Sequence, residues 1–381
     1  MPSSVAPDGA MPLAAVLPGD AAPWFQVRSI ANERFHFDTC AGRYLLLAFV
    51  ASASGGVGAA AAAAFGTRTD LFDGYNAALM VVSADPADEA GKRLGETGSV
   101  KAFWDFDRAV ARLYGIADEQ AAFGVRPTLF LVDPGLRVVA VRPLRTMEDA
   151  QAMLDLLARL PRVERPQPFV RQAPVLLVDH VFEPGLCRAL IDYCESQGTV
   201  DSGYMTQIGD KTVGVVDYGH KRRQDCWIRD ETLMAATRAR ILRRLVPQIE
   251  KAYQFRVTRL ERYIVACYDA EIGGYFRPHR DNTTTGTAHR RFAVTINLNA
   301  EQYRGGDLRF PEFGNRIFRA PTGGAVVFSC GLLHEATPVI SGRRYAFLPF
   351  LYDEAAAEIR ARNLDTVARP AGRAAAGGDP D

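Results

Sequence analysis

The sequence has few cysteines, almost no net charge and no long apolar run. Six cysteines in 381 residues, with no Cys-x-x-Cys pair, are too few for a disulfide scaffold, and we interpret them as reduced thiols of a cytoplasmic protein. The formal net charge of +1 gives no electrostatic reason to expect nucleic acid as a partner. No apolar stretch approaches the roughly 20 residues that span a bilayer. The first residues lack a basic segment followed by an apolar one, so we expect neither a secretory signal nor a membrane partner.

Composition along the chain indicates two domains. A proline-rich stretch at 159–173 is typical of a semi-extended linker. It separates an N-terminal domain at 15–158 from a C-terminal domain at 174–355. We expect a flexible N-terminus at 1–14 and a disordered tail at 356–381, where Ala, Arg, Gly and Pro dominate.

The N-terminal domain alternates predicted strands with predicted helices. Apolar runs at 44–50, 78–83 and 128–133 are of the kind that a doubly covered sheet requires, and 59–73 reads as a helix between the first two. Together with Pro-Gly-Asp-Ala-Ala-Pro at 18–23, this order resembles the peroxiredoxins and related thioredoxin-fold proteins. The resemblance implies an α/β thioredoxin-like fold.

The active-site thiol of a peroxiredoxin is absent from this chain. That chemistry needs a cysteine of low pKa in the first turn of the helix after the first long strand. Here residues 51–58 are Ala-Ser-Ala-Ser-Gly-Gly-Val-Gly, and Cys40, which precedes the strand, is the one cysteine in the first 180 residues. A serine is too weakly acidic to replace a thiolate without a base beside it. We therefore expect a degenerate domain that serves structure, dimerisation or substrate presentation, and thiol peroxidase activity is a remote alternative.

The strongest functional signal is His279 and Asp281, followed by His334 and Arg344. Residues i and i+2 of a strand point to the same face, so His279 and Asp281 could offer a nitrogen and an oxygen to one metal ion. His334 would complete the two-histidine, one-carboxylate triad of non-haem Fe(II) oxygenases, which leaves coordination positions open. The planar guanidinium of Arg344 can hold a carboxylate in two parallel hydrogen bonds. The alternatives are a structural histidine at 279 and a solvated arginine at 344.

The surroundings of these residues resemble a known family. The stretch 265–282, from Val-Ala-Cys-Tyr to Gly-Tyr-Phe-Arg-Pro-His-Arg-Asp-Asn, is similar to the 2-oxoglutarate/Fe(II) dioxygenases of the prolyl 4-hydroxylase type. Gly-Gly-Asp-Leu at 305–308 and the ten-residue step from His334 to Arg344 also fit that family. The resemblance extends over about 174–355. It implies a double-stranded β-helix (jelly roll) with flanking helices and the iron at its open mouth.

The resemblance further implies a set of cofactors and a reaction. Fe(2+), 2-oxoglutarate as co-substrate and O2 would hydroxylate a C–H bond with release of succinate and CO2, and ascorbate is an additional candidate cofactor. His279, Asp281 and His334 would bind the metal. Because Asp281 keeps a carboxylate where related halogenases leave a position open for halide, hydroxylation is favoured over chlorination.

The same resemblance implies a pocket for the co-substrate. Arg344 would pair with the distal carboxylate of 2-oxoglutarate. Tyr268, Thr295 and Asn297 would line the pocket, with Asn297 at the position where the oxygen-sensing prolyl hydroxylases carry a second tyrosine.

Several features leave alternatives open. The substrate could be peptidyl or a small molecule, and Arg277, Arg290 and Arg291 near the ligands would give the entrance a positive field suited to an anionic or peptide substrate. A homodimer fits the sequence as well as a monomer does. The glycine-rich segment 197–220 is typical either of a lid or of a disordered insertion. Besides an active dioxygenase, a catalytically silent binding or scaffold protein is an alternative.

Overall fold

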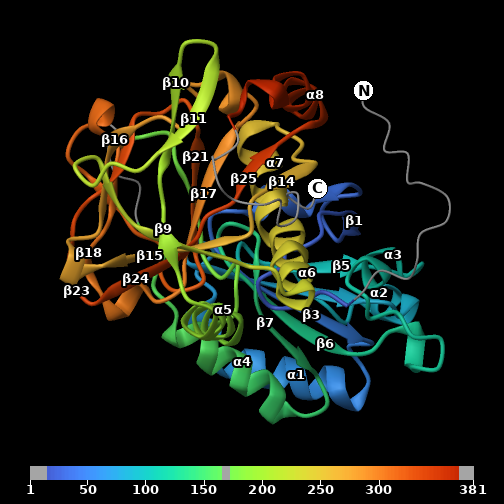
Figure 1. The fold of residues 1–381 in the computed structure, drawn as a ribbon. Helices are drawn as coiled ribbons and strands as arrows, with labels where there is room; N and C mark the ends of the chain where they lie inside the picture. Colours follow the sequence, from blue (N-terminus) through green and yellow to red (C-terminus); the bar gives the residue numbers. More distant parts are fainter. Residues whose placement is uncertain (1–14, 165–171, 369–381) are drawn as a thin grey trace. The chain divides into compact units, whose positions relative to one another are not determined.

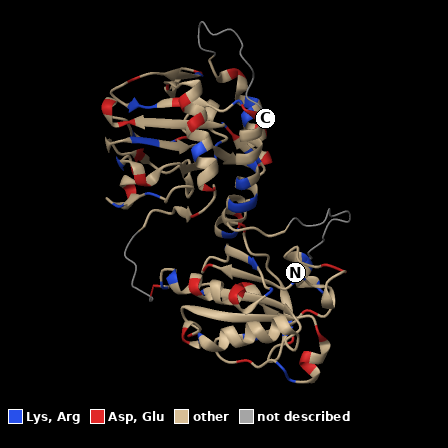
Figure 2. Ribbon diagram, turned by 90° about the horizontal axis from the view of Figure 1, so that it is seen from below, with Lys and Arg blue, Asp and Glu red and all other residues tan. Residues whose placement is uncertain are grey.

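The computed structural model describes residues 15–164 and 172–368 and divides into two units, 1–167 and 168–381 (Figure 1). The predicted flexible N-terminus at 1–14, residues 165–171 of the predicted linker and the end of the predicted tail at 369–381 lie outside the described residues. In the described ranges, none of the helices is long and apolar enough to cross a bilayer. Basic and acidic residues are mixed along both units (Figure 2).

The first unit is a seven-stranded sheet with the order β2-β1-β5-β4-β3-β6-β7, in which β3, β4 and β5 are parallel and β6 and β7 antiparallel to their neighbours. Alternate residues of β3 face opposite sides, so that Leu46 and Ala48 pack in one core cluster and Leu47 and Phe49 in another. The elements are β1 (Gln26–Ser29), β2 (Phe35–His36), β3 (Tyr44–Ala51), α1 (Gly56–Thr67), β4 (Ala77–Ser83), α2 (Pro86–Ala90), β5 (Val100–Trp104), α3 (Ala109–Leu113), β6 (Thr128–Val132), β7 (Val138–Pro143) and α4 (Met147–Arg159).

This arrangement confirms the predicted thioredoxin-like fold. The three predicted apolar strands are β3, β4 and β6, each buried on both faces. The predicted helix at 59–73 was placed too late, because α1 begins at Gly56 and ends at Thr67. Strands β1 and β5 escaped prediction, since neither has a long apolar run.

The second unit consists of two large β-sheets, two sheets of two strands each (β10-β11 and β18-β23) and the helices beside them. Its elements are β8 (Leu176–Val178), α5 (Pro184–Gln197), β9 (Val200–Asp201), β10 (Tyr204–Ile208), β11 (Lys211–Val215), β12 (Lys221–Arg222), β13 (Gln224–Trp227), α6 (Glu231–Arg240), a π-helical turn (Ile241–Leu245), α7 (Val246–Tyr253), β14 (Arg259–Glu261), β15 (Ile264–Asp269), β16 (Tyr275–His279), β17 (Phe292–Asn297), β18 (Arg304–Gly305), β19 (Leu308–Arg309), β20 (Ile317–Phe318), β21 (Ala325–Ser329), β22 (His334–Ala336), β23 (Val339–Ser341), β24 (Arg343–Phe347), β25 (Phe350–Tyr352) and α8 (Glu354–Asn363).

The larger sheet of this unit has the path β14-β25-β17-β24-β15-β13-β9, with β21 and β8 attached through β17. Its residues alternate between two cores. Val265 and Phe347 pack with apolar residues of α5 and α7, whereas Ala266 and Tyr268 pack with Phe276 of the smaller sheet. The smaller sheet, β12-β16-β22-β19-β20, thus covers the inner face of the larger one. This is the predicted jelly roll with flanking helices.

The predicted disordered tail at 356–381 is wrong for its described part. Residues 354–363 form α8, which begins at the cap Asp353, whose side chain accepts a hydrogen bond from the Ala356 amide at 3.0 Å. Asn363 then donates to the Thr285 carbonyl at 2.8 Å. The second unit therefore extends beyond the predicted limit of 355. Composition misled the prediction, because an Ala- and Arg-rich segment has little apolar periodicity yet a high helix propensity.

The glycine-rich segment 197–220 is also ordered. It contains the hairpin of β10 and β11, which pair over five residues from Tyr204 to Ile208. The hairpin is held on the unit by the side chain of Thr212, which accepts from the Gly286 amide at 2.9 Å, and by a bridge from Thr212 to Val367. Of the two alternatives for this segment, a disordered insertion is therefore wrong.

Candidate metal and co-substrate site

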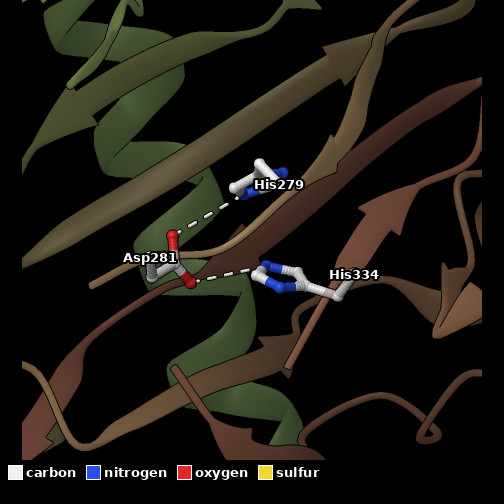
Figure 3. Close-up of side chains that lie close together, drawn as sticks. All are labelled: His279, Asp281 and His334. Carbon is white, nitrogen blue, oxygen red and sulfur yellow. Dashed lines mark ion pairs between the residues drawn. The ribbon is translucent and has the colours of Figure 1, made fainter. Parts of the chain in front are cut away.

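Two paired strands bring the metal-ligand candidates together. His279 is the last residue of β16 and His334 the first of β22, and the two are direct partners in this antiparallel pair. Asp281 lies just past the end of β16, where its amide donates to the Cys330 carbonyl at 3.0 Å. Figure 3 shows the Asp281 carboxylate beside the two imidazoles, with one oxygen directed toward each ring. The strand pairing thus joins residues that are 55 positions apart in the sequence.

The three side chains have the geometry of a metal site. Asp281 Oδ1 lies 3.6 Å from His279 Nε2, and Asp281 Oδ2 lies 3.4 Å from His334 Nε2 (Figure 3). One ligand atom from each residue falls within 4.8 Å of the others. Both Nδ1 atoms are engaged by a carbonyl two residues back, His279 with Arg277 at 2.8 Å and His334 with Leu332 at 3.0 Å. These contacts assign the proton to Nδ1 and leave each Nε2 free as a ligand.

Electrostatics favours the protonation states that metal binding requires. Burial lowers the pKa of His334 to about 4, and the nearby His279 adds to this shift. Burial alone would disfavour an ionised Asp281, but His334 and His279 hold its pKa below the usual range. At neutral pH the site therefore presents a neutral imidazole at His334 and a carboxylate at Asp281, the forms that coordinate a metal. Two imidazoles and one carboxylate are the donor set of non-haem Fe(II) sites, so the residues fit that ion.

Arg344 lies in the same cavity as the triad. It is 2% exposed, on β24, and its neighbour Arg343 points outward and is half exposed. The guanidinium of Arg344 lies over the Tyr268 ring, at 4.9 Å from the ring centroid. Nε and Nη1 are buried and have no hydrogen-bond partner among the described residues. A buried, unsatisfied guanidinium fork beside a metal site fits a bound carboxylate.

A glycine makes room for Arg344. Gly306 has a φ of +68°, and a Cβ there would lie 3.0 Å from Arg344 Cδ and 2.9 Å from Val339 Cγ2. A side chain at 306 would thus be strained and would displace the arginine. This is the structural role of the Gly-Gly-Asp-Leu sequence.

The other predicted pocket residues differ in their positions. Tyr268, the partner of Arg344 across the β15–β24 pair, and Thr295 are buried and line the cavity of about 600 Å³ that contains the triad. Asn297 is buried but is not among the lining residues, and its amide donates to the Ala320 carbonyl at 2.6 Å. The structure therefore brings Tyr268 and Thr295 to the site but not Asn297.

Glu261 and Arg290, whose contact the sequence did not predict, hold the backbone of the segment that contains Asp281. Glu261 accepts from His289 Nε2 at 2.7 Å and from Arg290 Nη2 at 2.7 Å. Arg290 also donates to the Asp281 carbonyl at 3.4 Å. Arg290 was predicted to contribute to a positive field at the entrance, whereas its charge is paired with Glu261 and its guanidinium also contacts the backbone of Asp281, a candidate metal ligand. No spacing in the sequence could reveal this contact, since the two residues come from different strands and loops.

In the first unit, the segment between β3 and α1 holds a hydrogen-bonded serine and no cysteine. Ser52 Oγ donates to Asp85 Oδ2 at 2.8 Å, and the Ala53 amide donates to Asp88 at 2.6 Å. Both carboxylates are buried and contact the Arg93 guanidinium. Burial raises the pKa of the Cys40 thiol, which disfavours the reactive thiolate.

We expect no thiol peroxidase activity from this unit. Peroxide reduction by the purified protein should be no faster than that by free cysteine at the same concentration, because Cys40 is the sole thiol of the unit and is held protonated. A thioredoxin-coupled assay of the protein and of Cys40→Ser measures this. Saturable, thioredoxin-dependent turnover that disappears in Cys40→Ser would contradict the degenerate assignment.

Comparison with known proteins matches both units. Residues 263–352 match the model of the 2OG-Fe(II) oxygenase superfamily, and residues 18–141 match that of the AhpC/TSA family. A PKHD-type hydroxylase of Shewanella baltica is 30% identical over 154 residues, which cover 38% of this chain and 65% of the relative. The chain thus matches just under two thirds of that relative's length. These matches confirm both resemblances seen in the sequence.

Solved structures are also similar to each unit. A prolyl-4-hydroxylase from Pseudomonas putida aligns over 53% of this chain and 97% of its own, with 19% identity and a TM-score of 0.36. A peroxiredoxin Q from Xanthomonas campestris aligns over 37% of this chain and 97% of its own, with 18% identity and a TM-score of 0.32.

Proposed function

We propose, from the match of residues 263–352 to the 2OG-Fe(II) oxygenase superfamily, that this protein is an Fe(II)- and 2-oxoglutarate-dependent hydroxylase. The observation that carries the proposal is the combination of the triad with an unsatisfied guanidinium in one cavity. A structural cluster would explain the paired carboxylate and histidines. It would not explain why Arg344 is buried without a partner, since leaving a charged group unsatisfied is costly.

In this proposal His279, Asp281 and His334 hold Fe(II), and Arg344 pairs with the distal carboxylate of 2-oxoglutarate. The bound ion and O2 supply oxidative decarboxylation of 2-oxoglutarate to succinate and CO2, coupled to hydroxylation of a C–H bond. The protein's part is positioning. The two Nδ1 contacts fix the imidazole rings, and Arg290 fixes the backbone at Asp281.

Aromatic side chains shield the ligands from water. The Phe276 ring stacks on His279 with centroids 3.4 Å apart, and the Phe328 ring lies 4.5 Å from His334. An apolar wall of this kind strengthens electrostatic contacts within the site and limits side reactions with solvent.

The substrate of the proposal is a peptidyl or small-molecule compound. The name of the curated relative, a PKHD-type hydroxylase, supports hydroxylation. We extend the proposal to ascorbate as an accessory cofactor and to a cytoplasmic location, which the six free cysteines support. A homodimer is also compatible with it.

Succinate release tests this function. The Fe(II)-loaded protein should convert 2-oxoglutarate to succinate, and fractions of a cell extract that contain the substrate should stimulate this release. Asp281→Ala, assayed with the same fractions, provides the background. Equal succinate release by the two proteins in every fraction, together with no Fe(II) binding, would favour the silent scaffold instead.

A further inference from the structure

Arg262 lines the same cavity as the triad but has no part in the proposed co-substrate binding. It lies between β14 and β15, and its Nη2 donates to the Leu348 carbonyl at 3.3 Å. Its Nε is buried and has no hydrogen-bond partner. Burial and the neighbouring Arg290 lower its pKa to about 10, so the side chain is cationic at neutral pH.

The other cations of the cavity wall are accounted for. Three arginines are paired with carboxylates. These pairs are Arg223 with Asp225 at 2.7 Å, Arg280 with Glu312 at 2.8 Å, and Arg290 with Glu261 at 2.7 Å. Lys221 donates to Ser202 Oγ at 2.8 Å and to the Gly203 carbonyl, and burial holds its pKa well below the usual range. Arg360 donates to the Tyr352 hydroxyl at 3.2 Å.

By contrast, Arg262 has no ion pair with any carboxylate of the described residues. Its chain neighbour Glu261 is engaged by His289 and Arg290. With Arg344 assigned to the co-substrate, Arg262 is a cavity arginine without an ion pair of its own, and the nearest carboxylates, Glu261 and Asp225, are engaged by other cations. Arg262 is partly exposed in the cavity wall, so an anion that enters the cavity can reach it and compensate its charge.

The backbone at Arg262 is strained. Its φ of +71° lies in the left-handed region, which a residue with a long side chain rarely adopts. Arg262 lies between the end of β14 and the start of β15, two strands that are not neighbours in the larger sheet (Figure 1). Backbone strain of this kind persists where the surrounding structure holds it, and it is concentrated at binding sites.

An aromatic platform links Arg262 to the metal site. The Arg262 and Arg290 guanidinium carbons lie 4.1 and 4.0 Å from the centroid of the Phe350 ring. Arg290 in turn contacts the Asp281 carbonyl. A group bound at Arg262 would therefore lie near Phe350 and Arg290, whereas the guanidinium of Arg344 lies over the Tyr268 ring.

We propose that Arg262 anchors an anionic group, a carboxylate or a phosphate, of the primary substrate. The inference rests on the proposed function and adds to it the class of substrate: a compound or peptide that carries a negative charge away from the C–H bond to be hydroxylated. Arg262 is then a specificity-determining residue, because a neutral analogue leaves its guanidinium unpaired.

Ligand-dependent thermal unfolding of the full-length protein tests this site. The protein, loaded anaerobically with Fe(II) and 2-oxoglutarate at constant ionic strength, is titrated with inorganic phosphate, N-acetylglycine and the neutral N-acetylglycinamide. A ligand that binds only the folded state raises the unfolding midpoint in a saturable way. We expect stabilisation by phosphate or by N-acetylglycine and none by the amide. Phosphate alone would indicate a phosphorylated substrate, and N-acetylglycine alone a carboxylate.

Matched variants locate the binding. Arg262→Gln should weaken the apparent affinity for the anion roughly ten- to a hundredfold, which corresponds to a lost hydrogen bond to a charged group. Arg262→Lys should retain part of it, and Arg280→Gln, whose arginine lines the cavity but pairs with Glu312, should match the wild type. Anion binding that persists in Arg262→Gln, or its absence from the wild type, overturns the proposal.

The same titrations separate this inference from the proposed function. Stabilisation by 2-oxoglutarate should survive in Arg262→Gln, which also shows that this variant is folded, and should be lost in Arg344→Gln. The response to the anion should survive in Arg344→Gln. If the wild type binds the anion at Arg262 but shows no response to 2-oxoglutarate, the co-substrate assignment fails while the anion site stands.

Discussion

His279→Ala and His334→Ala are each expected to abolish Fe(II) binding and hydroxylation. In the proposed site each imidazole supplies one of three protein ligands, and the Asp281 carboxylate lies within 3.6 Å of both Nε2 atoms. Loss of a residue that merely orients a ligand costs about 10- to 100-fold in metal affinity, so loss of a ligand should cost more than about 100-fold. Fe(II) content after anaerobic dialysis and the rate of succinate formation measure the two effects.

His289→Gln is the matched control for the ligand variants. His289 is also a buried histidine of this cavity, but its Nε2 contacts Glu261, a contact that a glutamine amide can replace. It should bind one Fe(II) per chain, like the wild type. Wild-type iron affinity in both His279→Ala and His334→Ala would contradict the assignment of the triad. Asp281→Gly should also lose hydroxylation. Chlorination of the substrate by this variant in chloride buffer would be informative, but the prediction does not require it.

Arg344→Ala is expected to raise the apparent constant for 2-oxoglutarate by roughly one to three orders of magnitude. Removing one partner of a hydrogen-bonded charge pair in a shielded site costs roughly 2–5 kcal/mol, at about 1.4 kcal/mol per tenfold. Fe(II) affinity should hardly change, because the guanidinium is not a ligand. Initial rates of succinate formation at varied 2-oxoglutarate concentration give the constant.

Arg343→Ala tests the register of the last strand. Arg343 is half exposed and pairs with Asp269 at 2.6 Å, an exposed contact of the kind that contributes about 0–1 kcal/mol. Its loss should leave the 2-oxoglutarate constant nearly unchanged. If neither arginine variant changes the dependence on 2-oxoglutarate, the co-substrate is not bound by this strand, even where the iron triad is intact.

The candidate site was largely predictable because its signals are local. Side chains two positions apart in an extended segment project to the same side, so His279 and Asp281 could be paired from the sequence. The same alternation placed Arg344 with Ala346 and separated it from Arg343, as the structure has it. In the first unit, the lack of a peroxiredoxin thiol could be predicted because residues 51–58 contain no cysteine, and this can be read from the sequence without the tertiary structure.

Other features depended on contacts between distant parts of the chain. The ordered tail follows from the contacts of α8 and Asn363 with the Thr285 turn, which composition does not encode. The buried position of Asn297 depends on the Ala320 carbonyl, 23 residues away. The hairpin of β10 and β11 is anchored by Thr212 at Gly286.

The sequence by itself predicted the two folds, the candidate metal ligands and the absence of a peroxiredoxin thiol. Those conclusions require only residue types, strand periodicity and short spacings. Only the tertiary structure shows which charges form ion pairs. Arg290 pairs with Glu261, whereas Arg344 and Arg262 line the same cavity without an ion pair among the described residues. The physical reason is that the strength of an ion pair depends on the distance between the two charges and on their shielding from water. Neither quantity can be inferred from positions along the chain.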